Sequence, residues 1–370
     1  MKKFILTLVL SAMMVITPLS AFADDSQTDS TTETSSVYEQ AADVASKYID
    51  TISLNTPDWQ NSSLTFKYPL VDFNGQLTSF LFAVNSEDYA AGYIIVSADN
   101  PTVLESTREG EDPYRDLVGS EEQAVYIGAT QYYIKKDEST YYDVRQEKIM
   151  NRDEFLSNGF LQGESFDLNV IPEKNTLVVE NPSLMSEIAP ATIISYSSKK
   201  ISSVPDITWR KGCSPTSFGN IIRYWKNNGY SSLLASSTTD DTLVDVLASS
   251  SYMNTNSAGG TGWDDRVNGM KKFWSDRGYT VSVSRGSANF NTHKTEMNAN
   301  RPDIINVVND ATYSDHDMTG VGYEEYQDTD QNLKWFRYVI VHDTWSNTPT
   351  DVYLYMPQLS WNETVKVVPQ

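Results

Sequence analysis

The chain has 370 residues, a formal net charge of −21 and a single cysteine. An acidic surface of this kind disfavours nucleic acid and anionic membranes as partners, and one cysteine excludes an internal disulfide framework. Residues 1–23 contribute +2, residues 24–200 carry 12 basic and 30 acidic groups (−18), and residues 201–370 carry 14 and 19 (−5), which together give −21. This uneven distribution predicts a domain boundary near residue 200 in a chain long enough for two ordinary domains.

The first 23 residues have the pattern of a secretory signal peptide. Lys2 and Lys3 form a basic start, an apolar run extends from Phe4 to Leu19, and residues 21–23 read Ala-Phe-Ala, which fits a cleavage site. The run is short for a membrane anchor and contains Pro18 near its end. We therefore expect a secreted, extracellular protein of bacterial type that has no membrane partner once the signal is removed.

Residues 24–36 are mostly Ser, Thr and Asp and predict a disordered leader. Residues 37–180 predict an N-terminal α+β domain, with a helix from about Val37 and strands near 64–70, 77–83, 92–98, 125–134 and 141–144. This domain contains neither cysteine nor histidine, so it has few means of nucleophilic or metal chemistry. It is predicted to be a scaffold, a binding module or a pro-segment.

Residues 181–203 are rich in Pro, Ser and Ala and end near Lys199 and Lys200. This composition predicts the linker between the two domains. Two interpretations stay open: a flexible stretch whose basic pair is accessible to proteolysis, or an ordered strap that joins the domains.

The cysteine, Cys213, opens the most informative stretch of the second domain, residues 204–370. Behind it, Phe218, Ile221, Ile222 and Trp225 fall at i, i+3, i+4 and i+7, which predicts an amphipathic helix that stops at residues 227–229. Cys213 would then lie at a helix N-terminus, where unpaired N–H groups lower a thiol's pKa. The alternative, a small buried apolar residue, gives no reason for a helix entrance behind a glycine.

The remaining elements of this domain are two further helices near 240–253 and 263–277, a strand near 279–284 and a short helix near 291–300. From Asp303 the pattern changes to strands, near 304–308, 318–323, 335–341 and 352–355. Helices followed by antiparallel strands predict an α+β fold in which the cysteine's helix packs on the sheet.

Only three histidines are present. His293 lies in a polar helix and is predicted to be solvated. His316 opens a strand in which Gly320 and Gly322 share its face, because alternate residues of a strand point the same way. A bare glycine face beside a histidine leaves room for another segment or a substrate.

The third histidine, His342, precedes Asp343 at the end of an apolar strand. Neighbours on a strand face opposite sides, so the two cannot serve one site. Asp343 follows a buried run and needs a donor, which an imidazole N–H could supply as the orienting member of a Cys–His–Asp triad. The alternative is that Asp343 only caps a turn with Thr344.

These residues resemble a known family. Gly212-Cys-Ser-Pro-Thr-Ser217 before an apolar helix, the His316 strand with its Gly-Val-Gly-Tyr, and the late Val341-His-Asp343-Thr-Trp are similar to the C39-like cysteine peptidases, which have a papain-like fold. The resemblance covers about residues 201–370 and keeps the family's order of Cys, His and Asp. It implies that Cys213 is the nucleophile, His316 the general base and then acid, and Asp343 the orienting residue.

One departure concerns the oxyanion. Papain-like enzymes carry a glutamine several residues before the cysteine, whereas this chain has no glutamine between Gln162 and Gln327. Loss of one oxyanion donor costs about 100- to 1000-fold in rate. The backbone N–H of Cys213 could supply one donor, and either the indole of Trp209 or the side chain of Arg210 could supply the other.

The N-terminal region also resembles a known type of domain. Residues 90–100, Ala-Ala-Gly-Tyr-Ile-Ile-Val-Ser-Ala-Asp-Asn, followed by Glu109-Gly-Glu-Asp112, look like the pro-domains of streptopain-type secreted cysteine peptidases. Such pro-domains block the cleft until they are removed, so the resemblance implies an intramolecular inhibitor and a zymogen.

The sequence therefore predicts a secreted cysteine peptidase that acts on peptide or protein substrates without metal or other cofactor. Two alternatives stay open. One is a cell-wall amidase or transpeptidase on the same fold, and the other is a non-catalytic secreted binding protein that keeps the fold.

Overall fold

The computed structural model describes residues 26–54, 59–86, 89–115, 122–145, 147–151, 193–310, 314–329, 332–346 and 348–370. The expected signal peptide and residues 181–192 of the expected linker lie outside these ranges. The described residues form an α+β fold with five α-helices and one sheet of fifteen strands, which is antiparallel except where β1 meets β5.

The N-terminal region consists of one long helix and eight strands. They are α1 (Ser26–Ser53), β1 (Ser63–Val71), β2 (Leu77–Ser86), β3 (Tyr89–Ser97), β4 (Val103–Thr107), β5 (Gln123–Tyr126), β6 (Tyr132–Lys135), β7 (Thr140–Asp143) and β8 (Lys148–Asn151). The apolar face of α1, with Ala41, Ala45 and Tyr48, packs on β1–β4. The single strand expected over 125–134 is two strands, because the chain turns back between Tyr126 and Tyr132.

Helix α1 begins at Ser26, within the segment of residues 24–36 that was expected to form the leader. Once the apolar stripe from Val37 onward has nucleated the helix, each added residue gains a backbone hydrogen bond.

The C-terminal region contains four helices and seven strands. They are β9 (Ile193–Lys200), α3 (Cys213–Asn227), α4 (Asp240–Ala248), α5 (Trp263–Ser275), β10 (Val281–Ser287), α6 (Phe290–Asn298), β11 (Asp303–Asp310), β12 (Ser314–Asp328), β13 (Lys334–His342), β14 (Val352–Tyr355) and β15 (Trp361–Pro369), with short 3-10 turns at η4 (Ser231–Leu233) and η5 (Met356–Gln358). The last strand, β15, was not anticipated, and β12 is far longer than expected.

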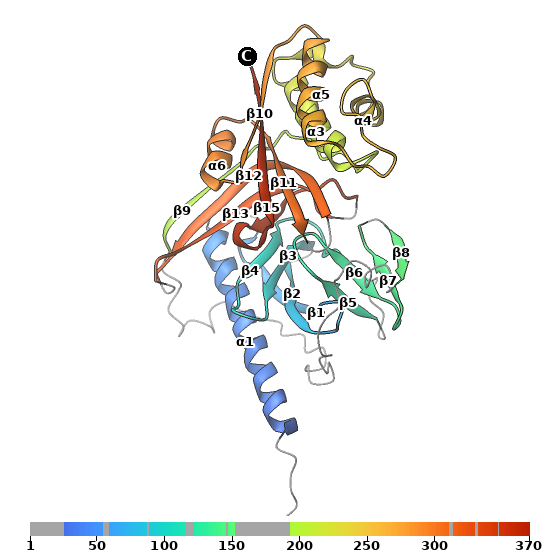
Figure 1. Ribbon diagram of the computed structural model, residues 1–370. Coiled ribbons are helices and arrows are strands. Elements are labelled where there is room, and N and C mark those ends of the chain that lie inside the picture. Colours follow the sequence, from blue (N-terminus) through green and yellow to red (C-terminus); the bar gives the residue numbers. More distant parts are fainter. Residues whose placement is uncertain are drawn as a thin grey trace, which may run out of the picture.

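The central strands carry helices on both faces. Figure 1 shows α3, α4 and α5 grouped on one side of the strands and α6 on the other. The alternation of β11 follows this arrangement: Ile304 packs with α3–α5, whereas Ile305 and Val307 pack in a second cluster with α6. Side chains on neighbouring positions of β11 and β12 therefore serve two separate environments.

The two regions share the sheet. Strand β4 pairs with β14 through Ser106 with Tyr353 and Glu105 with Leu354, so the sheet continues from one region into the other. Figure 1 shows the N-terminal strands as a continuation below the orange C-terminal strands. The buried pair of Arg108 with Glu324 adds an ionic contact across the same boundary.

Strand β9 bears on the expected linker. Residues 193–200 pair with β12 from Gly322 to Asp328, and Lys200 forms a salt bridge with Asp351. This part of the segment is therefore an ordered strap and not a flexible linker, because its backbone donors and acceptors are used in the ladder. The basic pair Lys199–Lys200 lies within it.

Candidate active site

Cys213 is the first residue of α3, as the sequence predicted. Gly212 before it has φ of +156°, and a Cβ there would lie 2.5 Å from the carbonyl oxygen of Gly259. Any other residue at 212 would collide with backbone. The glycine thus allows the loop at Gly259 to close against the start of the helix and fixes where the thiol emerges.

The pKa of the Cys213 thiol departs from the expectation. Cys213 is only partly exposed, and this burial, followed by the charge of the Asp317 carboxylate, raises the thiol's pKa to about 11. The backbone N–H groups of Asp317 and Ser214 bond to the sulfur and act in the opposite direction. The helix N-terminus was expected to lower the pKa, but desolvation and the nearby carboxylate outweigh it.

Asp317 is the centre of a buried polar network behind the thiol. Its Oδ2 accepts a hydrogen bond from the Ser214 hydroxyl at 2.5 Å, and its Oδ1 accepts from the Asn306 amide at 2.7 Å. Arg266 forms ion pairs with both Asp317 and Glu363. Sequence reasoning missed these residues. The available signal was a charged residue in the middle of a strand that carries buried residues on both faces.

His316 precedes Asp317 on β12 and projects to the opposite face. It is buried, its Nε2 donates to the backbone carbonyl of Asp343 at 3.2 Å, and its ring stacks on Trp345 with centroids 5.5 Å apart. Burial, with a further contribution from the charge of Arg145, lowers the pKa of His316 to about 4. The imidazole is therefore neutral at neutral pH.

Asp343 follows β13 and is fully buried. Its Oδ1 accepts hydrogen bonds from the Trp345 N–H at 3.0 Å and the Thr348 hydroxyl at 2.6 Å, and its Oδ2 has no partner within the described part of the chain. Burial and the charge of Asp206 raise its pKa to about 8. In this structure the Asp343 side chain caps the turn after β13, while its backbone carbonyl binds His316.

The structure connects the neighbourhoods of these residues through two contacts. Ser214, which follows Cys213, bonds to Asp317, which follows His316, and His316 bonds to the backbone carbonyl of Asp343. Asp317, and not His316, is the side chain that faces the start of α3.

A cleft of about 410 Å³ is lined by Trp345, the residue on which the His316 ring stacks. Trp209 and Trp345 line it from the C-terminal region, with their rings stacked at 6.1 Å. Arg145 and Glu147 line it from the β7–β8 connection of the N-terminal region. The Arg145 guanidinium lies 5.6 Å from the Trp345 ring, so the N-terminal region forms one wall of the cleft.

The two candidates for the second oxyanion donor are distinguished by their contacts. The Arg210 guanidinium binds both oxygens of Asp245 on α4, at 2.9 and 2.7 Å, which commits it away from the cleft. Trp209 lines the cleft, and its indole N–H bonds to no residue in the described ranges. Trp209 is therefore the better placed of the two.

His293 corrects a sequence expectation, since it is fully buried and not solvated. Its Nδ1 bonds to the Asp303 carboxylate at 3.0 Å and its Nε2 donates to the Gly322 carbonyl at 2.7 Å. A Cβ at Gly320 would lie 2.2 Å from Asp303 and 2.9 Å from the His293 ring. The bare glycine face thus accommodates α6, and not a substrate.

His342 is also buried and bonded at both nitrogens, to the Pro205 carbonyl at 3.0 Å and to Asp351 at 3.1 Å. Both partners are hydrogen-bond acceptors. Burial lowers the pKa of His342, but the nearby carboxylates of Asp351 and Asp206 raise it by more, so the pKa is raised on balance. His293 and His342 have structural ion pairs. His316 differs from them in that its neighbour in the chain, Asp317, contacts the start of α3.

Residues 195–368 match the family described as the Peptidase_C39 like family, which confirms the family that the motifs predicted. A comparison with curated proteins found no match. Among the described residues, no helix has the length and apolar character needed to cross a membrane, and no group of three or more His, Cys, Asp and Glu is arranged to hold a metal ion.

Proposed function

We propose that the chain is a secreted cysteine peptidase that hydrolyses peptide bonds through Cys213, His316 and Asp343 in a papain-like arrangement. The observation that carries the proposal is the contact between the start of α3 and β12: the hydroxyl of Ser214, which follows Cys213, donates to the carboxylate of Asp317, which follows His316. It lies within the region that matches a peptidase-like family. A nucleophile at a helix N-terminus with a histidine at hand is the arrangement that thiol chemistry requires.

In the proposed reaction, His316 takes the thiol proton and the Cys213 thiolate attacks the peptide carbonyl carbon. The N–H of Cys213 and the indole N–H of Trp209 would bind the oxyanion. The C–N bond then breaks as His316 gives the proton to the leaving amine, which leaves a thioester on Cys213. Water, deprotonated by His316, hydrolyses the thioester and returns the thiol. The Asp343 carbonyl, which accepts from Nε2, orients the imidazole.

We further propose that the full-length chain is a latent precursor, with the N-terminal region as its intramolecular inhibitor. Two features support this. The Arg145 charge disfavours protonation of His316, and Arg145 and Glu147 occupy one wall of the cleft. A protonated thiol and a neutral imidazole form no thiolate–imidazolium pair. Displacing Arg145 would raise the pKa of His316 and open the cleft together.

The test compares full-length wild type, Cys213→Ala, His316→Ala and Arg145→Gln, with Arg115→Gln as the matched N-terminal control. Two quantities are measured: the pH dependence of Cys213 alkylation and the hydrolysis of a broad set of fluorogenic peptides. Arg145→Gln should alkylate faster near neutral pH and gain hydrolysis, and the His316 and Cys213 variants should lack hydrolysis. If folded wild type and folded Arg145→Gln are alkylated at the same rate and neither hydrolyses any peptide, both the peptidase proposal and the latent-precursor proposal are contradicted.

A second candidate is a non-catalytic secreted binding protein. The raised pKa of Cys213, about 11, favours a binding protein, because the pKa of a nucleophilic thiol is ordinarily lowered. The same experiment separates the two candidates. A thiol that stays unreactive in Arg145→Gln, in protein that melts like wild type, identifies the binding protein.

A further inference from the structure

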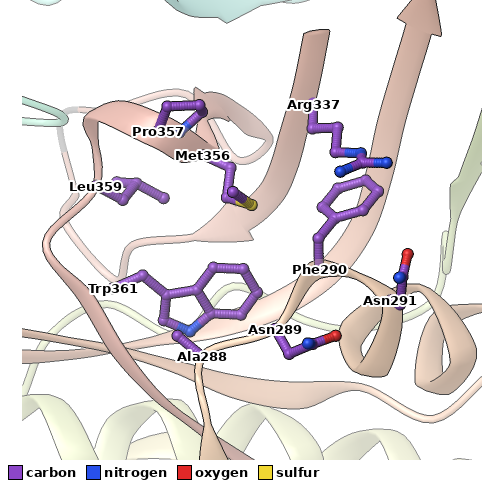
Figure 2. A pocket seen from close by; sticks show the side chains of 9 residues that line it. All are labelled: Ala288, Asn289, Phe290, Asn291, Arg337, Met356, Pro357, Leu359 and Trp361. Carbon is purple, nitrogen blue, oxygen red and sulfur yellow. The ribbon is translucent and has the colours of Figure 1, made fainter. Parts of the chain in front are cut away.

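A second cavity, which we call the α6 pocket, shares no lining residue with the cleft at Trp209 and Trp345. Figure 2 shows it between the start of α6, the turn after β14 and the first residue of β15. Its volume is about 440 Å³, within the range of cavities that hold small ligands or single large side chains. No step of the proposed reaction uses it.

The floor and sides of the pocket are apolar. Phe290, Met356, Leu359 and Trp361 line it, and Figure 2 shows the Trp361 ring below Met356 and the Phe290 ring to the right, next to Arg337. The Trp361 indole N–H donates to the Glu363 carbonyl at 3.0 Å, so the ring offers the cavity an apolar surface. Such walls favour an aromatic or branched aliphatic group.

One side of the pocket carries a cation. The Arg337 guanidinium lies 5.3 Å from the Phe290 ring centroid and bonds through Nε to Glu325 at 3.3 Å. Glu325 is shared with Lys294, so two cations face one carboxylate. Within the described residues, neither Nη atom of Arg337 has a hydrogen-bond partner. A carboxylate beside the apolar floor would bind these donors and balance the surplus charge.

The strand register relates the pocket to the candidate active site. Trp361 lies opposite Val307, and Val307 lies opposite His316, so the three residues form one row across β15, β11 and β12. At about 4.8 Å per strand, Trp361 is roughly 10 Å from His316 on the same face. Arg337, on the other side of the pocket, lies opposite Glu325, nine residues beyond His316 on β12.

We propose that the α6 pocket binds the C-terminal residue of a peptide, with a large apolar side chain against Trp361 and Phe290 and the terminal carboxylate on Arg337. This inference rests on the proposed function only for the class of ligand. A free small aromatic acid has the same chemistry, and the experiment distinguishes the two.

The experiment uses the full-length chain with Cys213→Ala, so that no turnover disturbs binding. Fluorescently labelled pentapeptides that end in phenylalanine acid, phenylalanine amide or alanine acid are titrated by fluorescence anisotropy, with N-acetylphenylalanine as competitor. The peptide that ends in phenylalanine acid should bind roughly tenfold or more tightly than either other peptide. The amide lacks the charged hydrogen bond to Arg337, and the alanine peptide lacks the large apolar side chain. Added Arg337→Gln should abolish the difference between acid and amide, and Lys334→Gln, an exposed cation on the same strand, should preserve it.

Equal binding of acid and amide, or an acid preference that survives Arg337→Gln, overturns the proposal. N-acetylphenylalanine that binds as tightly as the peptide overturns the assignment of a peptide. If the wild-type chain hydrolyses peptides but the binding pattern is absent, the proposed function stands and the proposed role of the α6 pocket is wrong. If the binding pattern is present but no peptide is hydrolysed, the role of the pocket stands and the proposed function is wrong.

Discussion

Replacing Asp317 with asparagine tests the electrostatics around the thiol. Asparagine has the same shape but carries no charge; its Oδ1 can still accept from Asn306, and its Nδ2 can donate to the Ser214 hydroxyl in place of the bond that Asp317 accepts there. The carboxylate of Asp317 is one of the two causes that raise the pKa of Cys213 to about 11, from an ordinary value of 9.0. A negative charge disfavours the thiolate, so its removal should lower the pKa. Arg266, relieved of one partner, acts in the same direction.

The magnitude follows from the order of the causes. Burial is the larger cause and remains in Asp317→Asn, so we expect the pKa to fall by about one unit, which means roughly ten times more thiolate at neutral pH. A less basic thiolate is also less nucleophilic, by a factor of about three per unit. The net gain in alkylation rate at neutral pH should therefore be about three- to fourfold.

The assay measures the iodoacetamide rate as a function of pH for wild type, Asp317→Asn and the control Asp245→Asn, whose carboxylate pairs with Arg210 on the surface. Thermal melting establishes that each variant is folded. The midpoint of the rate profile should move to lower pH only in Asp317→Asn. A midpoint that stays in place or moves upward in folded Asp317→Asn would refute the reasoning and leave burial as the whole cause.

Three further predictions concern other parts of the site. Trp209→Phe should lower the rate of peptide hydrolysis by about 100- to 1000-fold, whereas Arg210→Gln should change it little, because only Trp209 lines the cleft. Comparable losses in the two variants would contradict the assignment of Trp209 as the oxyanion donor. Burial raises the pKa of Asp343 to about 8, so the folded chain keeps a proton that the unfolded chain releases near pH 4, and stability should fall as pH rises between these values. Urea midpoints should show a flatter pH profile in Asp343→Asn, and an unchanged slope would count against the prediction. Asp303→Asn removes the carboxylate partner of buried His293 and should cost about 3–5 kcal/mol of unfolding free energy, measured by urea denaturation; a loss below about 1 kcal/mol would mean that His293 is neutral there.

The features that the sequence predicted well are local. The stripe from Phe218 to Trp225 defines α3 and the place of Cys213, since a helix of 3.6 residues per turn needs no distant information. The alternation of residues near His316 likewise gives β12 and the direction of its side chains. The sequence order of Cys213, His316 and Asp343 identified the family.

What the sequence could not show depends on contacts between distant residues. His293 looks solvated in its own helix and is buried because Asp303 and the bare Gly320 meet it across the fold. The pKa of Cys213 is raised by burial and by the charge of Asp317, which is more than 100 residues away in the chain. Helix position alone could not predict which of these opposing electrostatic effects is larger.

Because β4 pairs with β14, cleavage of the chain between the two regions and dissociation of the two regions are separate events. A cut between residues 152 and 192 would break a covalent bond without breaking the β4–β14 ladder or the Arg108–Glu324 pair. A nicked precursor would therefore remain a two-chain complex. Dissociation would expose Val352–Tyr355 as an edge strand whose unpaired backbone groups accept any extended segment, so an excess of such peptides should hasten release and the free enzyme should be prone to self-association.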